Sequence, residues 1–199
     1  MLSRLRLPVV VWLAFLFTAC ATVQMSQQGN GNLQRFFLDA RLSIKLERAD
    51  ETPQFVSGQL LWQHDGAKQQ DSLQILSPFG HTLAALNRQA GLAEVTLANG
   101  RQFQAESLKA LAAQGLGYEL PFDALPDWLK GSGSPRAVTS FDAFQRPAQL
   151  DDGIWHVRYT YPDNHADSLP SILQISSDEG LSLRIMVDRW LTGASAHEQ

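Results

Sequence analysis

The feature that most constrains the fold is a period-two alternation of apolar and polar residues that recurs along the chain. Residues 41–47 read Arg-Leu-Ser-Ile-Lys-Leu-Glu, which places the apolar side chains on one face of an extended segment. The same pattern returns at residues 60–62, 73–75, 84–86, 95–97, 155–160, 173–175 and 183–188. Such alternation is typical of strands that bury one face, and it predicts a mainly β fold of about eight to eleven strands.

Short turn signals separate these segments. Asn99-Gly100 is a strong hairpin signal with residues 101–104 as the returning strand, and residues 178–180 (Asp-Glu-Gly) separate the last two strands. Strands joined in sequence by tight turns pair in antiparallel fashion. Because a sheet of this size limits its exposed edges by curling, we expect a single antiparallel β-barrel.

Two short helices interrupt the strands. The first is predicted at residues 106–114, ended by Gly115 and Gly117. The second is predicted at residues 124–130, with Asp123 as its N-cap and Gly131 as its stop. Both are too short to form a domain of their own. We expect them to cover one opening of the sheet, which makes the fold α+β with β predominant.

The N-terminus has the pattern of a lipoprotein signal. Arg4 and Arg6 precede an apolar run at residues 7–17, which is too short to span a bilayer core of roughly 20 residues but suits a signal peptide. Small residues then precede Cys20, the single cysteine of the chain. This resembles the lipobox of bacterial lipoproteins. We therefore expect residues 1–19 to be a signal peptide and Cys20 to carry lipid; the alternative is an ordinary secretory signal with an incidental cysteine.

The rest of the chain divides simply. Residues 20–34 are rich in Gln, Asn, Gly and Ser and are expected to form a tether, residues 35–191 one domain, and residues 192–199 a tail. Ala21 rather than Asp follows the cysteine, which by resemblance to enteric sorting signals favours the periplasmic face of the outer membrane. With a single cysteine consumed by lipid, we expect no disulfide.

Charge and motifs exclude several functions. The chain has 16 Lys+Arg against 20 Asp+Glu and no basic stretch, so we expect no nucleic-acid partner. No hydrolase, P-loop, dinucleotide or zinc motif occurs. His64 beside Asp65, and His165 between Asp163 and Asp167, are interpreted as solvated turn residues. We expect no catalytic residue, no metal, no cofactor and no enzymatic activity.

Four segments in fixed order carry a family resemblance. They are Ser77-Pro78-Phe79-Gly80, residues 117–122 (Gly-Tyr-Glu-Leu-Pro-Phe), residues 125–131 (Leu-x-x-Trp-Leu-x-Gly) and residues 183–190 (Leu-Arg-Ile-Met-Val-Asp-Arg-Trp). Together with the lipobox they resemble the LolB family, outer-membrane lipoproteins that receive other lipoproteins from the periplasmic carrier LolA. The resemblance covers roughly residues 35–191.

The resemblance implies a fold, a task and partners. The fold is an unclosed antiparallel β-barrel with a hydrophobic interior covered by short helices. The task is to bind the acyl chains of client lipoproteins, delivered by LolA, and to insert them into the outer membrane, as a monomer. The inward residues expected to line an acyl-binding cavity are Leu42, Ile44, Leu60, Trp62, Leu73, Ile75, Leu125, Trp128, Trp155, Val157, Leu183 and Ile185.

The loop Pro78-Phe79-Gly80 is the other site that the resemblance implies. In the family this loop projects an apolar residue, usually Leu, that is needed to insert clients into the membrane. Phe79 occupies that position here, and the exchange of Leu for Phe keeps the hydrophobicity and changes the shape. The alternative is that Phe79 belongs to the core beside a turn.

Three other functions compete with the receptor. A soluble carrier of the same fold must leave the membrane with its cargo, and Cys20 argues against that role. A structural or ligand-binding outer-membrane lipoprotein would have a filled core and no transfer activity. An envelope hydrolase would depend on a single Ser, His or Asp for a measurable activity.

Overall fold

The computed structural model describes residues 34–47, 52–89, 91–116, 120–133 and 137–192. The predicted signal peptide, Cys20 and nearly all of the tether lie outside these residues. Eleven strands form one sheet: β1 Arg35–Leu46, β2 Gln54–Asp65, β3 Gln70–Leu76, β4 Thr82–Gln89, β5 Leu92–Leu97, β6 Gln102–Ala105, β7 Val138–Phe141, β8 Pro147–Asp152, β9 Trp155–Thr160, β10 Ile172–Ser177 and β11 Leu181–Thr192.

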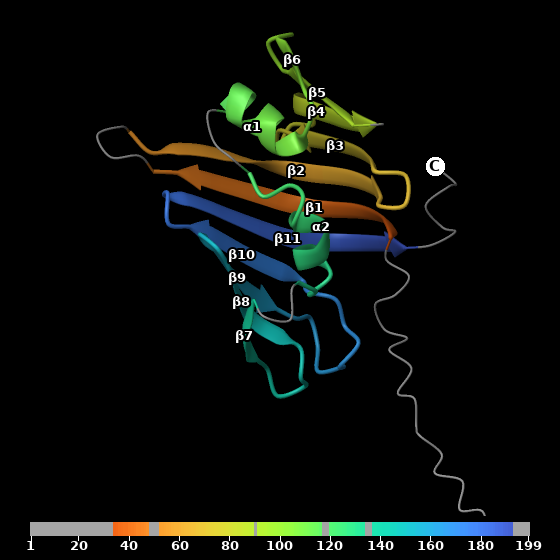
Figure 1. Cartoon of the computed structure of the whole chain (residues 1–199), viewed down its shortest axis with the longest axis vertical. Helices are drawn as coiled ribbons and strands as arrows, with labels where there is room; N and C mark the ends of the chain where they lie inside the picture. Colours follow the sequence, from red (N-terminus) through yellow and green to blue (C-terminus); the bar gives the residue numbers. More distant parts are fainter. Residues whose placement is uncertain (1–33, 48–51, 90, 117–119, 134–136, 193–199) are drawn as a thin grey trace, which may run out of the picture.

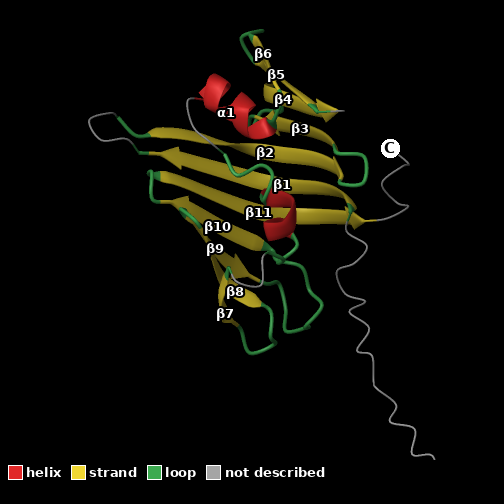
Figure 2. Ribbon diagram, viewed as in Figure 1, coloured by secondary structure: helices red, strands yellow, loops and turns green. Residues whose placement is uncertain are grey.

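The sheet is antiparallel throughout and is not closed. Its strand order is β6-β5-β4-β3-β2-β1-β11-β10-β9-β8-β7, so β6 and β7 form the two edges (Figure 1). The first and last strands pair at its centre, with Ile44 opposite Leu183 and Leu42 opposite Ile185. Helices α1 (Leu108–Leu116) and α2 (Leu125–Leu129) lie over one face of the curved sheet (Figure 2). The prediction of an unclosed antiparallel β-barrel covered by short helices is confirmed.

Alternation along the strands builds the core on the face that the helices cover. In β1 every even-numbered residue from Phe36 to Leu46 is buried, while odd-numbered residues such as Arg41 and Lys45 face outward. Strands β2 to β5 and β9 to β11 repeat this arrangement. Since each strand has only one apolar face, the sheet must curve and accept the helices to remove that face from water.

The helices start and end at different residues from those predicted. α1 begins at Leu108, where the Ser107 hydroxyl accepts a hydrogen bond from the Ala110 amide at 3.1 Å, and it continues through Gly115 to Leu116. The prediction that Asp123 caps α2 is wrong, because Ala124 is the N-cap residue and no side chain caps it. The Asp123 carboxylate instead lies 3.5 Å from the guanidinium of Arg88.

Two strands were not predicted from the sequence. β7 and β8 pair irregularly, with register shifts between Val138 and Phe141, and β8 starts at Pro147. β8 reads Pro-Ala-Gln-Leu-Asp-Asp, with Leu150 its single buried residue, so it lacks the alternation that marks a strand. Among the described residues, no helix is long and apolar enough to cross a membrane.

Candidate functional site

An apolar cavity of about 320 Å³ lies between the inner face of the sheet and the helices. Residues from β1 to β5 and β11 form its wall, and Leu111 and Ala112 of α1, Leu120, Phe122 and Leu125 cover it. Every residue that lines it is apolar. The volume is at the lower end of the range of known ligand pockets, about 300–1,000 Å³. A wall of this kind can bind an apolar ligand through the hydrophobic effect, but it offers no group for proton transfer or metal binding.

Most of the residues that we expected to line a cavity meet here. Nine of the twelve do so: Leu42, Ile44, Leu60, Trp62, Leu73, Ile75, Leu125, Leu183 and Ile185. The wall also includes residues that the prediction omitted. Val95, Leu97 and Leu86 continue the same alternation on neighbouring strands, and Leu111 lies on α1. The period-two spacing of Val95, Leu97 and Leu86 in their strands, and the helical spacing of Leu111, are the sequence signals that could have identified them.

The other three residues lie outside this cavity, which corrects the prediction for Trp128, Trp155 and Val157. Trp128 of α2 is 2% exposed, and its ring centroid lies 6.3 Å from that of Trp155 on β9. Val157 is buried in the same half of the sheet. Trp128 of α2 packs against Trp155 of β9, so the inner face is packed here, whereas the part of the sheet that α1 covers borders the cavity.

The cavity reaches the surface at one end of the sheet. Val56, near the start of β2, lines the cavity and is also 37% exposed. Leu46, at the end of β1, and Leu181, at the start of β11, line the cavity at the same end. We call this end the mouth.

The opposite end is closed by aromatic rings. Phe36 of β1 packs edge-to-face on Trp62 of β2, with centroids 5.5 Å apart, and on Trp190 of β11, at 5.3 Å. Phe36 and Trp62 are almost fully buried. Among the described residues, these rings close this end of the cavity to an apolar ligand.

A buried polar cluster completes the closed end. The Asp71 carboxylate accepts hydrogen bonds from Trp62 Nε1 at 2.8 Å and Arg88 Nε at 2.7 Å, and it lies 2.7 Å from His64 Nδ1. Burial would raise the pKa of Asp71, but the hydrogen bonds from His64 and Trp62 and the charges of His64 and Arg88 outweigh it and lower the pKa. The interpretation of His64 as a solvated turn residue is wrong, because it lies on β2 and is buried.

Phe79 lies in the connection between β3 and β4 and is 87% exposed. Hydrogen bonds from the Gly80 amide to the Ser77 carbonyl (2.8 Å) and from the Ser77 amide to the His81 carbonyl (2.7 Å) close the turn, and Gly80 has a φ of +82°. Phe79 therefore lies at a turn tip, not in the core. Because the last residue of β3, Leu76, pairs with Gln59 in the first half of β2, this tip lies at the mouth end of the sheet.

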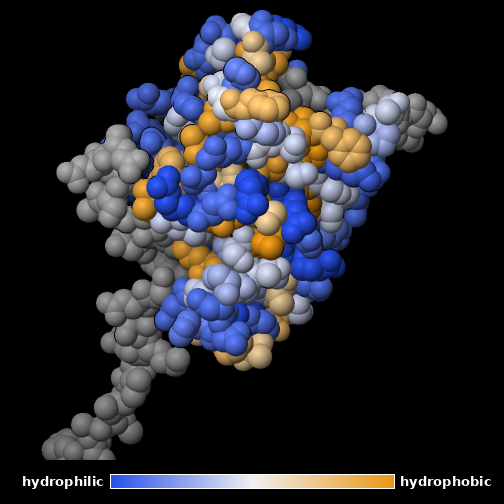
Figure 3. Space-filling model, turned by 180° about the vertical axis from the view of Figure 1, so that it is seen from behind, coloured by the Kyte–Doolittle hydropathy of each residue, from blue (hydrophilic) through white to orange (hydrophobic). Residues whose placement is uncertain are grey.

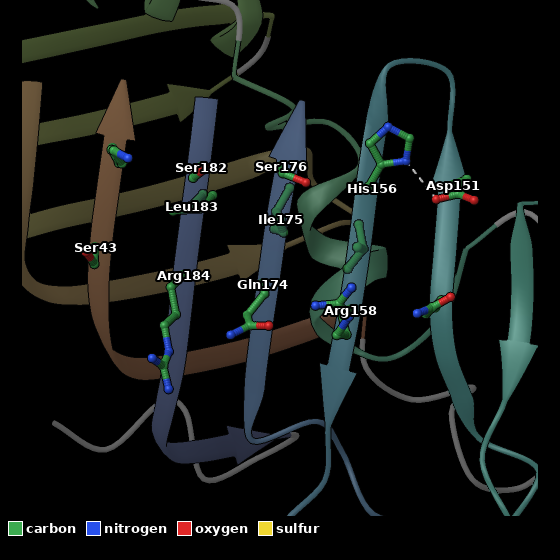
Figure 4. Close-up of a pocket in the computed structure, with 13 residues that line it drawn as sticks. Ser43, Asp151, His156, Arg158, Gln174, Ile175, Ser176, Ser182, Leu183 and Arg184 are labelled. Atoms are coloured by element: carbon green, nitrogen blue, oxygen red, sulfur yellow. Dashed lines mark hydrogen bonds and ion pairs between the residues drawn. The ribbon is translucent and has the colours of Figure 1, made fainter. Parts of the chain in front are cut away.

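A second hollow, on the outer face of the sheet, has different chemistry. Figure 4 shows Arg184, Gln174 and Arg158 in a row across β11, β10 and β9, as their pairing requires. His156 lies 2.8 Å from Asp151 and 3.0 Å from Asp178, and hydrogen bonds to these carboxylates raise its pKa above the usual 6.5. Within the described ranges no three His, Cys, Asp or Glu side chains are placed to hold a metal. The hollow is open and charged, so the inner cavity is the candidate site.

Comparison with known proteins identifies relatives along most of the chain. A family model described as "Outer membrane lipoprotein LolB" matches residues 34–190. Outer-membrane lipoprotein LolB of Dechloromonas aromatica (strain RCB) is 29% identical over 187 residues, which cover 94% of this chain and 97% of that protein. The protein of the same name from Azoarcus sp. (strain BH72) is 34% identical over 158 residues, 78% of each chain. A LolA superfamily protein of Nitrosomonas europaea aligns in structure with a TM-score of 0.42 and 12% identity, over 77% of this chain and 84% of that one.

Proposed function

This chain belongs to the LolB family of outer-membrane lipoproteins, and from that premise we propose that it receives client lipoproteins by binding their acyl chains in the inner cavity. It then passes these chains into the outer membrane. The observation that carries the proposal is the cavity itself, which has an entirely apolar wall and reaches the surface beside an exposed Phe79. Each methylene that leaves water for such a wall contributes about 0.8 kcal/mol.

The donor in this proposal is the periplasmic carrier LolA. The sequence contains no nucleotide-binding motif, so transfer has to run from a weaker to a stronger acyl binder. A tenfold preference for the receiver requires only about 1.4 kcal/mol. A cavity wall without polar side chains suits this task, because it holds the chains without hydrogen bonds that would have to break on release. The receptor role involves no chemical step and assigns no catalytic residue.

The direction of β1 sets the distance between the N-terminal end of the domain and the mouth. β1 starts at Arg35, at the closed end, and finishes at Leu46, at the mouth. Its twelve residues span about 36–40 Å. The segment from Cys20 to Arg35 can reach at most about 54 Å. We propose that Cys20 carries the lipid and that this length lets the mouth turn toward the membrane that holds the anchor.

Exchange of Phe79 for glutamate tests the division between uptake and delivery. We expect Phe79→Glu to accept a labelled lipoprotein from purified LolA as the original chain does, since Phe79 is not among the cavity residues. Release of the lipoprotein into liposomes should fall at least tenfold, because burying a phenylalanine side chain in lipid is worth about 1.5–3 kcal/mol and a glutamate opposes insertion. Both steps are measured by separating carrier, receiver and liposomes.

Phe141→Glu is the matched control. Phe141 is also a well-exposed phenylalanine (56%), but it lies at the end of β7 that is remote from the mouth. Both steps should proceed normally with this variant. If the original chain takes no lipoprotein from LolA, the protein is a structural or ligand-binding lipoprotein and the transfer proposal is wrong. If Phe79→Glu delivers as well as Phe141→Glu, the loop has no role in insertion.

A further inference from the structure

Phe79 is not the only apolar side chain exposed at the mouth. Phe55, in the first residues of β2, is 70% exposed, and its neighbour Val56 is 37% exposed. Single exposed apolar residues are common on protein surfaces. Large apolar side chains from two different hairpins at the opening of one cavity are a different case, because contiguous exposed apolar surface marks an interaction site.

Strand register places Phe55 and Phe79 near the mouth ends of two neighbouring hairpins, and we call these described ends the tips. The last paired residue of β3, Leu76, lies opposite Gln59 of β2, and β2 extends from there to Gln54 without a partner on that side. The turn that carries Phe79 therefore continues beside this free part of β2. The backbones are close, since a Cβ on Gly58 would lie 2.1 Å from the Leu76 carbonyl oxygen. Figure 3 shows that apolar patches lie among the polar residues of the face turned away from the viewer in Figure 1.

Basic side chains lie beside two aromatic rings near the mouth. The Lys45 ammonium, which also pairs with Glu47, is 5.9 Å from the centroid of the exposed Phe55 ring. The Arg101 guanidinium is 4.9 Å from the centroid of Phe103, a partly buried ring that follows the turn between β5 and β6. The acidic turn that contains Asp178 is separated from β2 by β1. Aromatic rings with a neighbouring cation match the boundary between lipid head groups and acyl chains, where rings enter the apolar layer and cations meet phosphates.

We infer that the mouth docks on the surface of a lipid bilayer through both hairpin tips, with Phe55 and Val56 as a second contact beside Phe79. The inference rests on the proposed function, in which the cavity must open toward the membrane to release acyl chains. A folded partner protein would need an interface of roughly 1,000 Å² or more, and a few side chains at two projecting tips do not supply it. A bilayer accepts such isolated apolar side chains individually.

The first experiment locates the tips relative to the membrane. Cys20 is the single cysteine and is proposed to be lipidated, so Phe55→Cys, Phe79→Cys and Phe141→Cys each provide one free thiol for a polarity-sensitive dye. The full-length lipidated variants are reconstituted in liposomes of phosphatidylethanolamine and phosphatidylglycerol that contain spin-labelled lipid. We expect strong quenching of the dye at positions 55 and 79 and none at position 141. Quenching at 79 without quenching at 55 would overturn the inference.

The second experiment measures the consequence for transfer. Phe55→Glu should accept lipoprotein from LolA normally and should release it into liposomes at least tenfold more slowly than the original chain. Normal release would show that Phe55 does not contact lipid, and failure of uptake in the original chain would contradict the proposed function but leave the quenching result standing. If the dye at position 55 is protected by LolA and not quenched by lipid, the second tip is a docking site for the carrier and the inference is wrong.

Discussion

Exchange of Ala84 for tryptophan is expected to abolish the uptake of acylated lipoprotein while the protein remains folded. Ala84 faces the cavity from β4, where it pairs with Ile75 on one side and Leu97 on the other. An indole in this position would occupy much of the cavity of about 320 Å³ that the acyl chains need. We expect at least a tenfold decrease in lipoprotein accepted from LolA, measured with a fluorescent client.

The neighbouring residue is the natural control. Ala85 pairs with Gln74 and Thr96, so it lies on the outer face of the same strand. Ala85→Trp should accept lipoprotein like the original chain, and both variants should retain a cooperative thermal transition by circular dichroism. Equal uptake by both tryptophan variants would mean that the acyl chains bind elsewhere.

Removal of the Asp71 carboxylate is expected to cause the largest loss of stability. Asp71 is 4% exposed and binds Trp62, His64 and Arg88 at the closed end. Asp71→Ala leaves the guanidinium of Arg88 without its buried partner, and breaking a buried ion pair from one side costs about 3–5 kcal/mol. We expect the free energy of unfolding in urea to fall by this amount. Asp151→Ala, which removes an exposed partner of His156, should lower it by less than about 1 kcal/mol.

The same carboxylate predicts an acid dependence of stability. The pKa of Asp71 in the folded protein lies below the usual value of 3.8. A carboxyl group whose pKa is lowered by folding stabilises the folded state at pH values above its usual pKa. This stabilisation is lost as the pH falls through the lowered pKa. The stability of the original chain should thus decrease below about pH 4, and that of Asp71→Ala should decrease less. Identical acid profiles for the two proteins would show that Asp71 is not held ionised by its partners.

Most of the fold is visible in the sequence because it follows from local patterns. The alternation at residues 41–47 predicts β1, and Asn99-Gly100 predicts the hairpin of β5 and β6. The pairing of β1 with β11, in contrast, joins residues about 140 positions apart, and no local pattern encodes it. Asp123 has the chemistry of a helix cap, but the tertiary contact with Arg88 takes its carboxylate away from α2.

The candidate site was only partly predictable for the same reason. Period two shows that Leu183 and Trp155 both face inward, but it does not show which inward residues touch each other and which border empty space. That depends on where the helices lie: α2 brings Trp128 against Trp155 of β9, while Leu125 of the same helix borders the cavity. The cluster of His64, Asp71 and Arg88 comes from three strands and carries no motif, so only their register reveals it.

The most direct test of the central claim is to find where the acyl chains lie. A client lipoprotein with a photoactivatable group near the end of one acyl chain is transferred from LolA to this protein, irradiated, and the cross-linked peptides are identified by mass spectrometry. We predict adducts on cavity residues such as Leu83, Leu111 and Leu183, and their loss in Ala84→Trp but not in Ala85→Trp. Adducts confined to the outer face of the sheet, or unchanged in Ala84→Trp, would contradict the proposal that this cavity receives the lipid.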